Sequence, residues 1–383
     1  MAFRFKKQIF GFMDLLRFKK MTDIRRTHLQ EGADTPIPET YTVNETARIL
    51  HPGNQDAKLV QIIQQSEDTK TYVFALSRPM FFRAGQYVTV RTKIGDSVVS
   101  RPYAISSSPL QALEEKRLHV TIKACGFFSK WMFDNAKVGD VMTIGDPSGD
   151  FYYDSIKDAN HIVAIAGGSG ITPFYSLASA MAEGSESCTM TLFYGAKTKK
   201  DLVFRDQLDA LVSDRFRVVY VLSNSTVKGM EKGFITADLI RRYVDVPDFT
   251  VMMCGPQAMY EFVGKELETL RLPAKRIKRE ANCVGTRDVE PKQYTLTVHI
   301  QDQTYTVPAD NRETLLTAME RAGLTVPAKC RAGGCGFCHS KLVSGTFSIA
   351  GADKRRLADS KFGYLHPCCS YPDSDIELIV PRG

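Results

Sequence analysis

The sequence predicts a protein of several domains and of mixed α+β and α/β class, with an antiparallel β-barrel, a Rossmann-like parallel sheet and a small C-terminal domain. Three observations support this prediction: the length of 383 residues, a change of hydrophobic pattern near residue 160, and five of nine cysteines in the C-terminal segment 330–383. A single hydrophobic core rarely grows beyond about 250–300 residues, so a chain of this length is expected to form two or three. The composition, with 43% hydrophobic and 24% charged residues, is that of an ordinary globular protein.

Two hydrophobic patterns define the predicted domains. Apolar residues alternate as in β-strands at 59–64, 72–76, 87–91 and 118–123, with glycine turns between them, which predicts an antiparallel barrel. Apolar strands at 162–166, 189–194, 217–222 and 250–254 alternate with helical segments, which predicts βα units on a parallel sheet. A polar stretch precedes a predicted hairpin at 295–307, and the segment 311–314 then leads into a helix that runs through Ala322. The expected parts are an N-terminal extension (1–48), a barrel (49–155), a nucleotide-type α/β domain (156–282), a linker (283–293) and a C-terminal domain (294–383).

The basic charge lies at the N-terminus. Residues 1–26 contain eight Lys or Arg and two Asp, so they account for +6 of the formal net charge of +7. A nucleic-acid enzyme would carry such charge on its folded body, so no nucleic-acid partner is expected. Four roles remain open for this basic and apolar segment: contact with an anionic membrane surface, docking on a partner, packing on the barrel, and disorder.

The cysteines and the N-terminus indicate a reducing compartment. The apolar run 9–16 is short, contains Asp14 and lacks a small-residue cleavage site, so it does not have the form of a secretory signal. No stretch approaches the ~18 apolar residues of a membrane-spanning helix. Cysteines in such a chain are more typical of metal or redox sites than of a disulfide framework. We therefore expect a cytoplasmic protein, with peripheral membrane contact through residues 1–26 as the alternative.

The strongest motif is the C-terminal cysteine pattern. It consists of Cys330, Cys335 and Cys338 in the spacing C-x4-C-x2-C, with Cys368 following after 29 intervening residues. This is the plant-type spacing of a 2Fe–2S cluster, whose two irons need four thiolates. The small loop residues let backbone N–H groups approach the negative sulfides; they are Ala332, Gly333, Gly334 and Gly336. A structural zinc site is the alternative, although zinc usually shows two CxxC-type pairs.

The C-terminal domain resembles a plant-type ferredoxin. The resemblance lies in the segment from Glu313 to Lys329, in the cysteine loop, and in the Cys-Cys-Ser-Tyr-Pro sequence at 368–372. It implies a β-grasp fold and a cluster that exchanges one electron. In that family two residues separate the fourth ligand from Tyr-Pro, which implies that Cys368 rather than Cys369 is the ligand.

A second motif falls on the barrel and has two parts. The first part is Arg101-Pro102-Tyr103-Ala104-Ile105-Ser106, which offers a cation for a phosphate, a flat ring and backbone donors. The second part is Gly126-Phe127-Phe128-Ser129, which precedes a helix whose first-turn amides suit phosphate oxygens. Ordinary strand and turn residues are the alternative.

Together these two parts resemble the flavin-binding barrel of the ferredoxin–NADP reductase superfamily. The resemblance implies FAD, with FMN as the alternative. It places the phosphates at Arg101 and residues 126–129 and stacks Tyr103 on the flavin ring. Ala104 stands where the family usually has Ser or Thr.

A third motif is a pair of turns at the carboxyl edge of the parallel sheet, where open α/β sheets bind ligands. The first turn contains Gly167, Gly168, Gly170 and Thr172, and the second is Cys254-Gly255-Pro256. A generic turn between strand and helix is the alternative. The superfamily resemblance implies that the first turn meets the pyrophosphate and nicotinamide, with Thr172 beside the flavin and Cys254 near the hydride path.

Two further segments concern the choice of nucleotide and an acidic residue of the expected flavin site. Superfamily members that use NADP carry a cation after the third strand, whereas residues 222–225 here read Leu-Ser-Asn-Ser, so NADH is expected. NADPH is the alternative, through Lys197, Lys199 and Lys200. Glu280 matches a family glutamate beside the flavin, and a surface acid is its alternative. The resemblance thus implies four residues in the catalytic centre: Tyr103, Thr172, Cys254 and Glu280.

The resemblance covers residues 58–383 and implies a function. The order of flavin, nucleotide and ferredoxin domains is that of single-chain reductases that serve oxygenases and desaturases. It implies an NAD(P)H:acceptor oxidoreductase that passes electrons from NADH through FAD and a 2Fe–2S cluster to a protein acceptor. Two other functions stay open: an electron-wiring subunit without its own NADH turnover, and a flavin or ferric reductase.

Overall fold

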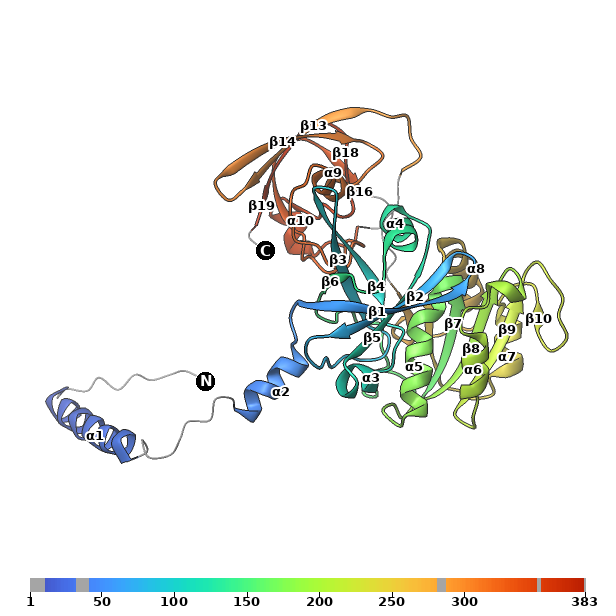
Figure 1. Ribbon diagram of the computed structural model, residues 1–383, viewed down its shortest axis with the longest axis horizontal. Coiled ribbons are helices and arrows are strands. Elements are labelled where there is room, and N and C mark those ends of the chain that lie inside the picture. Colours follow the sequence, from blue (N-terminus) through green and yellow to red (C-terminus); the bar gives the residue numbers. More distant parts are fainter. Residues whose placement is uncertain (1–10, 32–40, 281–286, 350–352, 382–383) are drawn as a thin grey trace. The chain divides into compact units, whose positions relative to one another are not determined.

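The computed structural model describes residues 11–31, 41–280, 287–349 and 353–381, and it divides into two units, residues 1–47 and residues 48–383 (Figure 1). The first unit contains α1 (Gly11–Glu31) and most of α2 (Thr42–Leu50). Part of the predicted N-terminal contact segment, including Ile9, lies outside the described residues, as do residues 283–286 of the predicted linker. Within the described residues, every helix falls short of the length or apolar character that crossing a bilayer requires.

The first domain of the second unit is a closed antiparallel barrel. Its strands are β1 (Gln55–Ser66), β2 (Thr69–Leu76), β3 (Tyr87–Ile94), β4 (Ser97–Ala104), β5 (Arg117–Lys123) and β6 (Val141–Ile144), in the order β4-β3-β6-β1-β2-β5. The two outer strands meet because Ile105 pairs with Val120, and Ser106 N donates to His119 O at 2.9 Å. Leu118 and Val120 alternate into the barrel core, as the period of a strand requires. The predicted barrel is confirmed.

Two helices accompany the barrel. They are α3 (Pro109–Glu114) and α4 (Phe127–Asn135). Ser108 caps α3, since its hydroxyl accepts a hydrogen bond from Gln111 N at 3.3 Å. The second helix follows the predicted phosphate turn directly and packs Phe128 and Met132 into the barrel core.

The second domain is a parallel sheet with helices on both faces. Its strands are β7 (His161–Gly167), β8 (Thr189–Ala196), β9 (Phe216–Leu222), β10 (Glu231–Lys232), β11 (Thr250–Cys254) and β12 (Ile277–Arg279), in the order β10-β9-β8-β7-β11-β12. The helices are α5 (Thr172–Ala182), α6 (Arg205–Leu211), α7 (Ala237–Tyr243) and α8 (Gln257–Glu268).

The residues of β7 face two different cores, which explains the continuous apolar run of the sequence. Ile162 and Ala164 pack in the core that contains Phe174 of α5, whereas Val163 packs with Tyr260 of α8. The chain order reverses between β7 and β11, which makes this pair the topological switch point where such sheets bind ligands. The predicted Rossmann-like domain is confirmed.

The third domain is a β-grasp. Its strands are β13 (Gln293–Ile300), β14 (Gln303–Asp310), β15 (Ser340–Ser344), β16 (Phe347–Ile349), β17 (Tyr364–Leu365), β18 (Ser370–Pro372) and β19 (Ile376–Val380), and its helices are α9 (Leu315–Arg321) and α10 (Leu357–Lys361). The main sheet has the order β14-β13-β19-β15-β17, with β13 and β19 parallel. The predicted hairpin is the pair β13 and β14. The helix predicted to follow 311–314 is α9, which Thr314 caps by accepting from Thr317 N at 3.3 Å.

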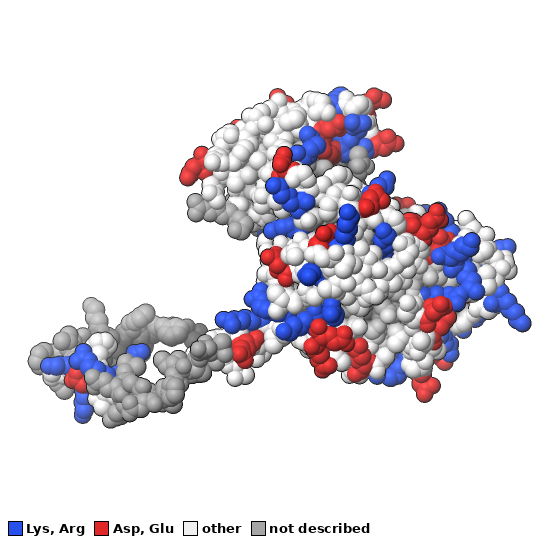
Figure 2. Space-filling model, in the orientation of Figure 1, with Lys and Arg blue, Asp and Glu red and all other residues white. Residues whose placement is uncertain are grey.

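Charges of both signs are interspersed on the face of residues 48–383 that Figure 2 shows. Basic residues of this unit pair with acids, as Lys123 does with Asp68 at 3.1 Å. Exposed pairs of this kind contribute only about 0–1 kcal/mol each to stability. They nevertheless leave the local charge of this surface balanced.

Candidate functional site

The four predicted cluster cysteines come together in the β-grasp domain. Cys330, Cys335 and Cys338 lie on the loop between α9 and β15, and Cys368 lies just before β18. The side chain of Cys330 hydrogen-bonds those of Cys335 and Cys368, and Cys338 also hydrogen-bonds Cys368. The contact with Cys335 lowers the pKa of Cys330, and the same contact raises the pKa of Cys335.

Backbone amides of the loop point at these sulfurs. Ala332 N donates to Cys330 Sγ at 3.4 Å, and a backbone hydrogen bond from Cys335 also lowers the pKa of Cys330. Gly333 has a φ of +80° and a Cβ there would lie 2.8 Å from Cys369 Sγ, so this position requires glycine. A loop that presents amides to sulfur suits a negatively charged iron–sulfur core.

The arrangement of the four thiols suits two metal ions better than one. The contacts run in series from Cys335 to Cys330, Cys368 and Cys338. A 2Fe–2S cluster divides four thiolates between two irons, and a series of contacts fits that division.

Cys369 has different partners from Cys368. Its thiol contacts the Cys368 side chain and donates to the His366 carbonyl oxygen at 3.5 Å. His366 is fully buried, and its Nδ1 lies 2.8 Å from Gly333 O while its Nε2 lies 3.1 Å from Asp359 Oδ2. His366 thus ties α10 to the cysteine loop, a role that the sequence analysis missed because no motif marks it.

The predicted flavin arginine lies against a carboxylate of the β-grasp domain. Nη1 of Arg101 on β4 donates to Ser100 O at 2.8 Å and to Glu320 Oε2 at 3.0 Å. Pro102 stands opposite Thr89 and Ala104 opposite Tyr87 in the pairing of β3 and β4. Arg101 therefore connects the flavin motif to α9.

The two halves of the flavin motif meet through their aromatic rings. The rings of Tyr103 and Phe128 are stacked, with centroids 6.1 Å apart and an interplanar angle of 29°. Phe128 is buried and Phe127 is exposed. The structure therefore brings Tyr103 and the start of α4 together, as the resemblance implies.

The hydroxyl of Ser129 forms hydrogen bonds within its own turn. Ser129 Oγ accepts hydrogen bonds from Cys125 N at 3.0 Å and from Gly126 N at 2.8 Å. The first helical bond of α4 runs from Lys130 N to Gly126 O, so the amides of residues 127–129 precede it. These first-turn amides, rather than the Ser129 hydroxyl, are the donors that suit a phosphate.

A buried chain of hydroxyl groups follows the flavin motif. Ser106 Oγ lies 2.9 Å from Thr121 Oγ1, which lies 2.8 Å from Thr71 Oγ1. Ile105 is buried in the barrel core. On the neighbouring strand, burial and the charge of Arg117 lower the pKa of His119 to about 4. His119 was not predicted as a site residue. Its backbone oxygen accepts a hydrogen bond from Ser106 N, and its backbone N–H donates to Ser107 Oγ.

The two predicted nucleotide turns pack closely against each other. A Cβ at Gly170 would lie 2.1 Å from the carbonyl oxygen of Cys254, so any larger residue would force the turns apart. Gly168 has a φ of +54° and its carbonyl oxygen accepts from Tyr194 Oη at 3.2 Å. Pro256 forms the N-cap of α8, directly after Gly255. The structure thus brings all of these predicted residues to the switch point.

Two hydroxyl groups anchor the start of α5. Thr172 Oγ1 donates to Ser169 O at 3.2 Å. One turn further on, Ser176 Oγ donates to Ser107 O at 2.6 Å, which joins the nucleotide domain to the end of the flavin motif. The predicted Thr172 therefore lies on a helix that contacts the barrel.

Cys254 and Glu280 lie together at the ends of β11 and β12. Glu280 N donates to Met253 O at 3.0 Å, and Tyr260 Oη donates to Glu280 O at 3.1 Å. Burial, followed by the charge of Glu280, raises the pKa of the Cys254 thiol. A neutral, buried thiol is a poor nucleophile, so Cys254 suits a site for hydride transfer better than one for covalent catalysis.

The segments that concern the nucleotide choice also lie side by side. Ser223 N donates to Ala196 O at 3.0 Å, and Asn224 N donates to Lys197 O at 2.9 Å. Lys199 opens a short 3-10 turn that ends at Asp201. The polar segment 222–225 and Lys197 therefore share the carboxyl edge of β8 and β9.

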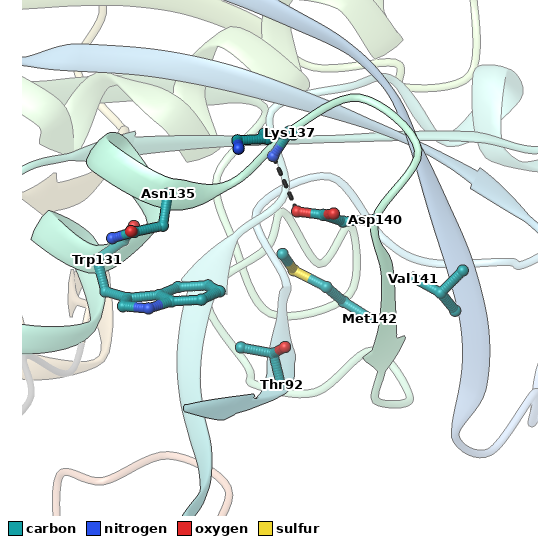
Figure 3. Close-up of a pocket in the computed structure, with 7 residues that line it drawn as sticks. All are labelled: Thr92, Trp131, Asn135, Lys137, Asp140, Val141 and Met142. Carbon is teal, nitrogen blue, oxygen red and sulfur yellow. Dashed lines mark hydrogen bonds between the residues drawn. The ribbon is translucent and has the colours of Figure 1, made fainter. Parts of the chain in front are cut away.

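A separate hollow of about 370 Å³ lies between α4 and the barrel (Figure 3). Its lining residues are Thr92, Trp131, Asn135, Lys137, Asp140, Val141 and Met142. Figure 3 shows the backbone of Lys137 hydrogen-bonded to Asp140, with an N–Oδ2 distance of 2.8 Å. The predicted flavin residues do not line this hollow, which is therefore distinct from the predicted site.

Family models match all three domains in the expected order. A model of the oxidoreductase FAD-binding domain matches residues 56–153, one of the oxidoreductase NAD-binding domain matches residues 164–265, and one of the 2Fe-2S iron-sulfur cluster binding domain matches residues 298–373.

Curated relatives align along most of this chain. The ferredoxin reductase component of 3-ketosteroid-9-alpha-monooxygenase from Mycobacterium tuberculosis is 29% identical, over 84% of this chain and 94% of that protein. NADH oxidoreductase HCR from Escherichia coli is 28% identical, over 83% of this chain and 95% of that protein. The glycine betaine monooxygenase reductase subunit of Chromohalobacter salexigens is 25% identical, over 85% and 95%.

Solved structures share the architecture. Phthalate dioxygenase reductase superposes with a TM-score of 0.64 at 22% identity, covering 86% of this chain and 98% of that chain. The Amycolatopsis cytochrome P450 reductase GcoB gives a TM-score of 0.52 at 26% identity, covering 59% of this chain and 69% of that chain. The likeness to phthalate dioxygenase reductase concerns the fold of all three domains.

Proposed function

The chain belongs to the ferredoxin–NADP reductase superfamily, as an oxidoreductase with flavin, nucleotide and 2Fe–2S domains, and we propose that it passes electrons from NADH to a protein acceptor. The observation that carries this proposal is the meeting of four cysteine thiols in the β-grasp domain. We propose the domain limits 49–155, 156–282 and 294–383 for the three modules. We also propose a cytoplasmic location.

The residues that would hold FAD lie at the barrel motif. When bound, FAD accepts a hydride and releases its two electrons singly, while a 2Fe–2S cluster takes one electron at a time. Arg101 supplies a cation and residues 126–129 supply amides for the phosphates. Tyr103 offers its ring to the flavin, and Ile105 and Ser106 offer the backbone of the same strand.

The residues that would hold the nucleotide lie at the two turns. Gly167, Gly168 and Gly170 leave room for a pyrophosphate to approach the backbone. Thr172, Cys254 and Glu280 line the route between nucleotide and flavin, where they orient the ring and exclude water. Their role is positional, because a hydride carries its own electron pair and needs no general base.

NADH rather than NADPH is the nucleotide that we propose. Residues 222–225 lack a cation for a 2′-phosphate, and the relative from Escherichia coli is named an NADH oxidoreductase. Lys197 lies beside Asn224 and is the residue through which NADPH would bind if this proposal is wrong.

An oxygenase is the acceptor that we propose. Relatives from Mycobacterium tuberculosis and Chromohalobacter salexigens are named as reductase parts of monooxygenases. We further propose that residues 1–26 dock on a partner protein. The described part of this segment exposes Leu16, Phe18, Met21 and Ile24 among basic residues, which supports a contact surface. A pull-down with residues 1–26 deleted tests this role.

Electron transfer with simple acceptors tests the proposed function. Each NADH oxidised to NAD⁺ and H⁺ supplies two electrons, so it should bleach the flavin band and reduce two ferric cytochrome c molecules. Cys338→Ser should abolish cytochrome c reduction and spare ferricyanide, which accepts electrons ahead of the cluster. Equal loss of both activities would contradict the electron order. Reduction by dithionite but not by NADH would instead support a wiring subunit.

A further inference from the structure

Glu320 of α9 is a buried carboxylate between two arginines of different domains. Its Oε2 lies 3.0 Å from Arg101 Nη1, on the flavin strand β4. Its Oε1 accepts from Arg331 Nη1 at 2.7 Å and its Oε2 from Arg331 Nη2 at 3.0 Å. The side chains of Glu320 and Arg331 are only 8% and 7% exposed, so both charges are removed from water.

The three charges depend on one another. Burial, followed by the charge of Arg331, lowers the pKa of Arg101, and Glu320 opposes this shift. Removing one partner of a buried ion pair is strongly destabilising, because the charge that remains is uncompensated. Without Glu320, two guanidinium groups would face each other across the domain contact. The carboxylate is therefore what permits the contact.

Arg331 is also held in an unusual backbone conformation. Its φ is +52°, in the left-handed region that non-glycine residues rarely adopt. Such strain persists where the surroundings fix it, often at functional sites. Here the fixed side chain belongs to the residue directly after Cys330, and its Nη1 also lies 3.4 Å from Ser100 O on β4. The cysteine loop is thereby tied to the strand that carries Arg101.

We propose that Glu320 is a positioning residue that fixes the cysteine loop against the flavin strand and so sets the relative position of cluster and flavin. This inference rests on the proposed function. Both Arg101 hydrogen bonds leave from Nη1, so Nε and Nη2 of the same guanidinium can serve a flavin phosphate. One arginine thus joins the flavin site to the β-grasp domain.

A second ion pair at this contact is weaker. Lys329 Nζ lies 2.9 Å from Asp146 Oδ2, but the two side chains are 26% and 36% exposed. Exposed pairs contribute about 0–1 kcal/mol, so this one adds little to the position of the domain. The proposal therefore assigns the positioning role to Glu320 and not to the rim of the contact.

Glu320→Gln in the full-length holoprotein tests the proposal. The matched control is Glu313→Gln, since Glu313 pairs with Arg321 inside the β-grasp domain at 2.5 Å. We expect Glu320→Gln to lower the kcat for cytochrome c at least about tenfold, since a misplacement of ~1 Å can cost on the order of 100-fold in rate. The ferricyanide kcat and the KM for NADH should stay at the parental values. Small-angle X-ray scattering of the same samples should show a larger radius of gyration, and Glu313→Gln should change neither measurement.

Two further measurements separate positioning from folding. The iron content and the low-temperature paramagnetic signal of Glu320→Gln should equal those of the parent. If Glu320→Gln loses iron, the test uses Glu320→Asp in its place. This variant keeps the charge but is one methylene too short to reach both arginines. Its rate of cytochrome c reduction should be intermediate. A parental cytochrome c rate with parental scattering in either variant overturns the proposal. Failure of the proposed function would appear differently, as a parent protein that NADH does not reduce.

Discussion

The hydroxyl of Ser176 donates a hydrogen bond to the carbonyl oxygen of Ser107 at 2.6 Å, and both residues are buried. Ser176 lies on α5, one turn after Thr172, and Ser107 directly follows the flavin motif. This bond holds the first nucleotide turn against the end of the flavin strand. On the proposed function, we expect this bond to set the relative position of the nucleotide and flavin sites.

Ser176→Ala should destabilise the protein by about 1–3 kcal/mol, because it leaves a buried carbonyl group without its donor. It should also slow the reduction of flavin by NADH, measured by stopped-flow absorbance, while the flavin content stays unchanged. Ser179→Ala is the control, since the Ser179 hydroxyl contacts Tyr175 of the same helix and does not cross to the barrel. Equal effects of the two substitutions on the rate would contradict this role of Ser176.

Gly170→Ala should separate the two nucleotide turns. The added Cβ would lie 2.1 Å from the carbonyl oxygen of Cys254, which is backbone and cannot move alone. We expect a loss of stability of about 1–3 kcal/mol, as for other overpacked sites, and a higher KM for NADH. Gly195→Ala in the neighbouring strand should have little effect on thermal unfolding, since its nearest atoms lie at 3.5 Å.

Cys368→Ser and Cys369→Ser should have opposite outcomes. Cys368 contacts both Cys330 and Cys338, whereas Cys369 contacts Cys368 and the His366 carbonyl group. Cys368→Ser should lose the cluster, measured as iron content and as the low-temperature paramagnetic signal after reduction. Cys369→Ser should keep both. Retention of the full signal in Cys368→Ser would show that the ligand set is different.

His119 should make stability depend on pH below neutrality. Its pKa is about 4 in the folded chain, against an ordinary value of 6.5, so the unfolded chain takes up a proton first as the pH falls. The free energy of unfolding should therefore fall between pH 6.5 and pH 4, by on the order of 3 kcal/mol from this residue. His119→Gln should lose that part of the decline, as measured by urea unfolding at pH 7 and pH 5. Parallel pH profiles of parent and variant would contradict the assignment.

The local motifs of this protein could be predicted from its sequence. Three of the four cysteine ligands fall within residues 330–338, so their spacing directly encodes the geometry that a cluster needs. The barrel and the parallel sheet follow from period-two alternation and from continuous apolar strands, which are also local signals. The helix predicted to follow 311–314 and to run through Ala322 begins directly after its cap at Thr314 and has Ala322 as its C-cap, so its bounds were also a local signal.

Other features became visible only when distant segments were brought together. Tyr194 supports the glycine turn through Gly168, 26 positions away, and no motif marks it.

The sequence by itself determined which chemical groups this protein carries and which strands, turns and helices hold them. The tertiary structure decided which charged residues meet. Arg101 and Glu320 are 219 positions apart, and the sequence contains 50 basic and 43 acidic residues that could pair. Most such residues remain in water, where an ion pair contributes little to stability. Burial is what makes the pairing of Arg101 with Glu320 structurally important. Because burial depends on how whole domains pack, spacing along the chain does not reveal it.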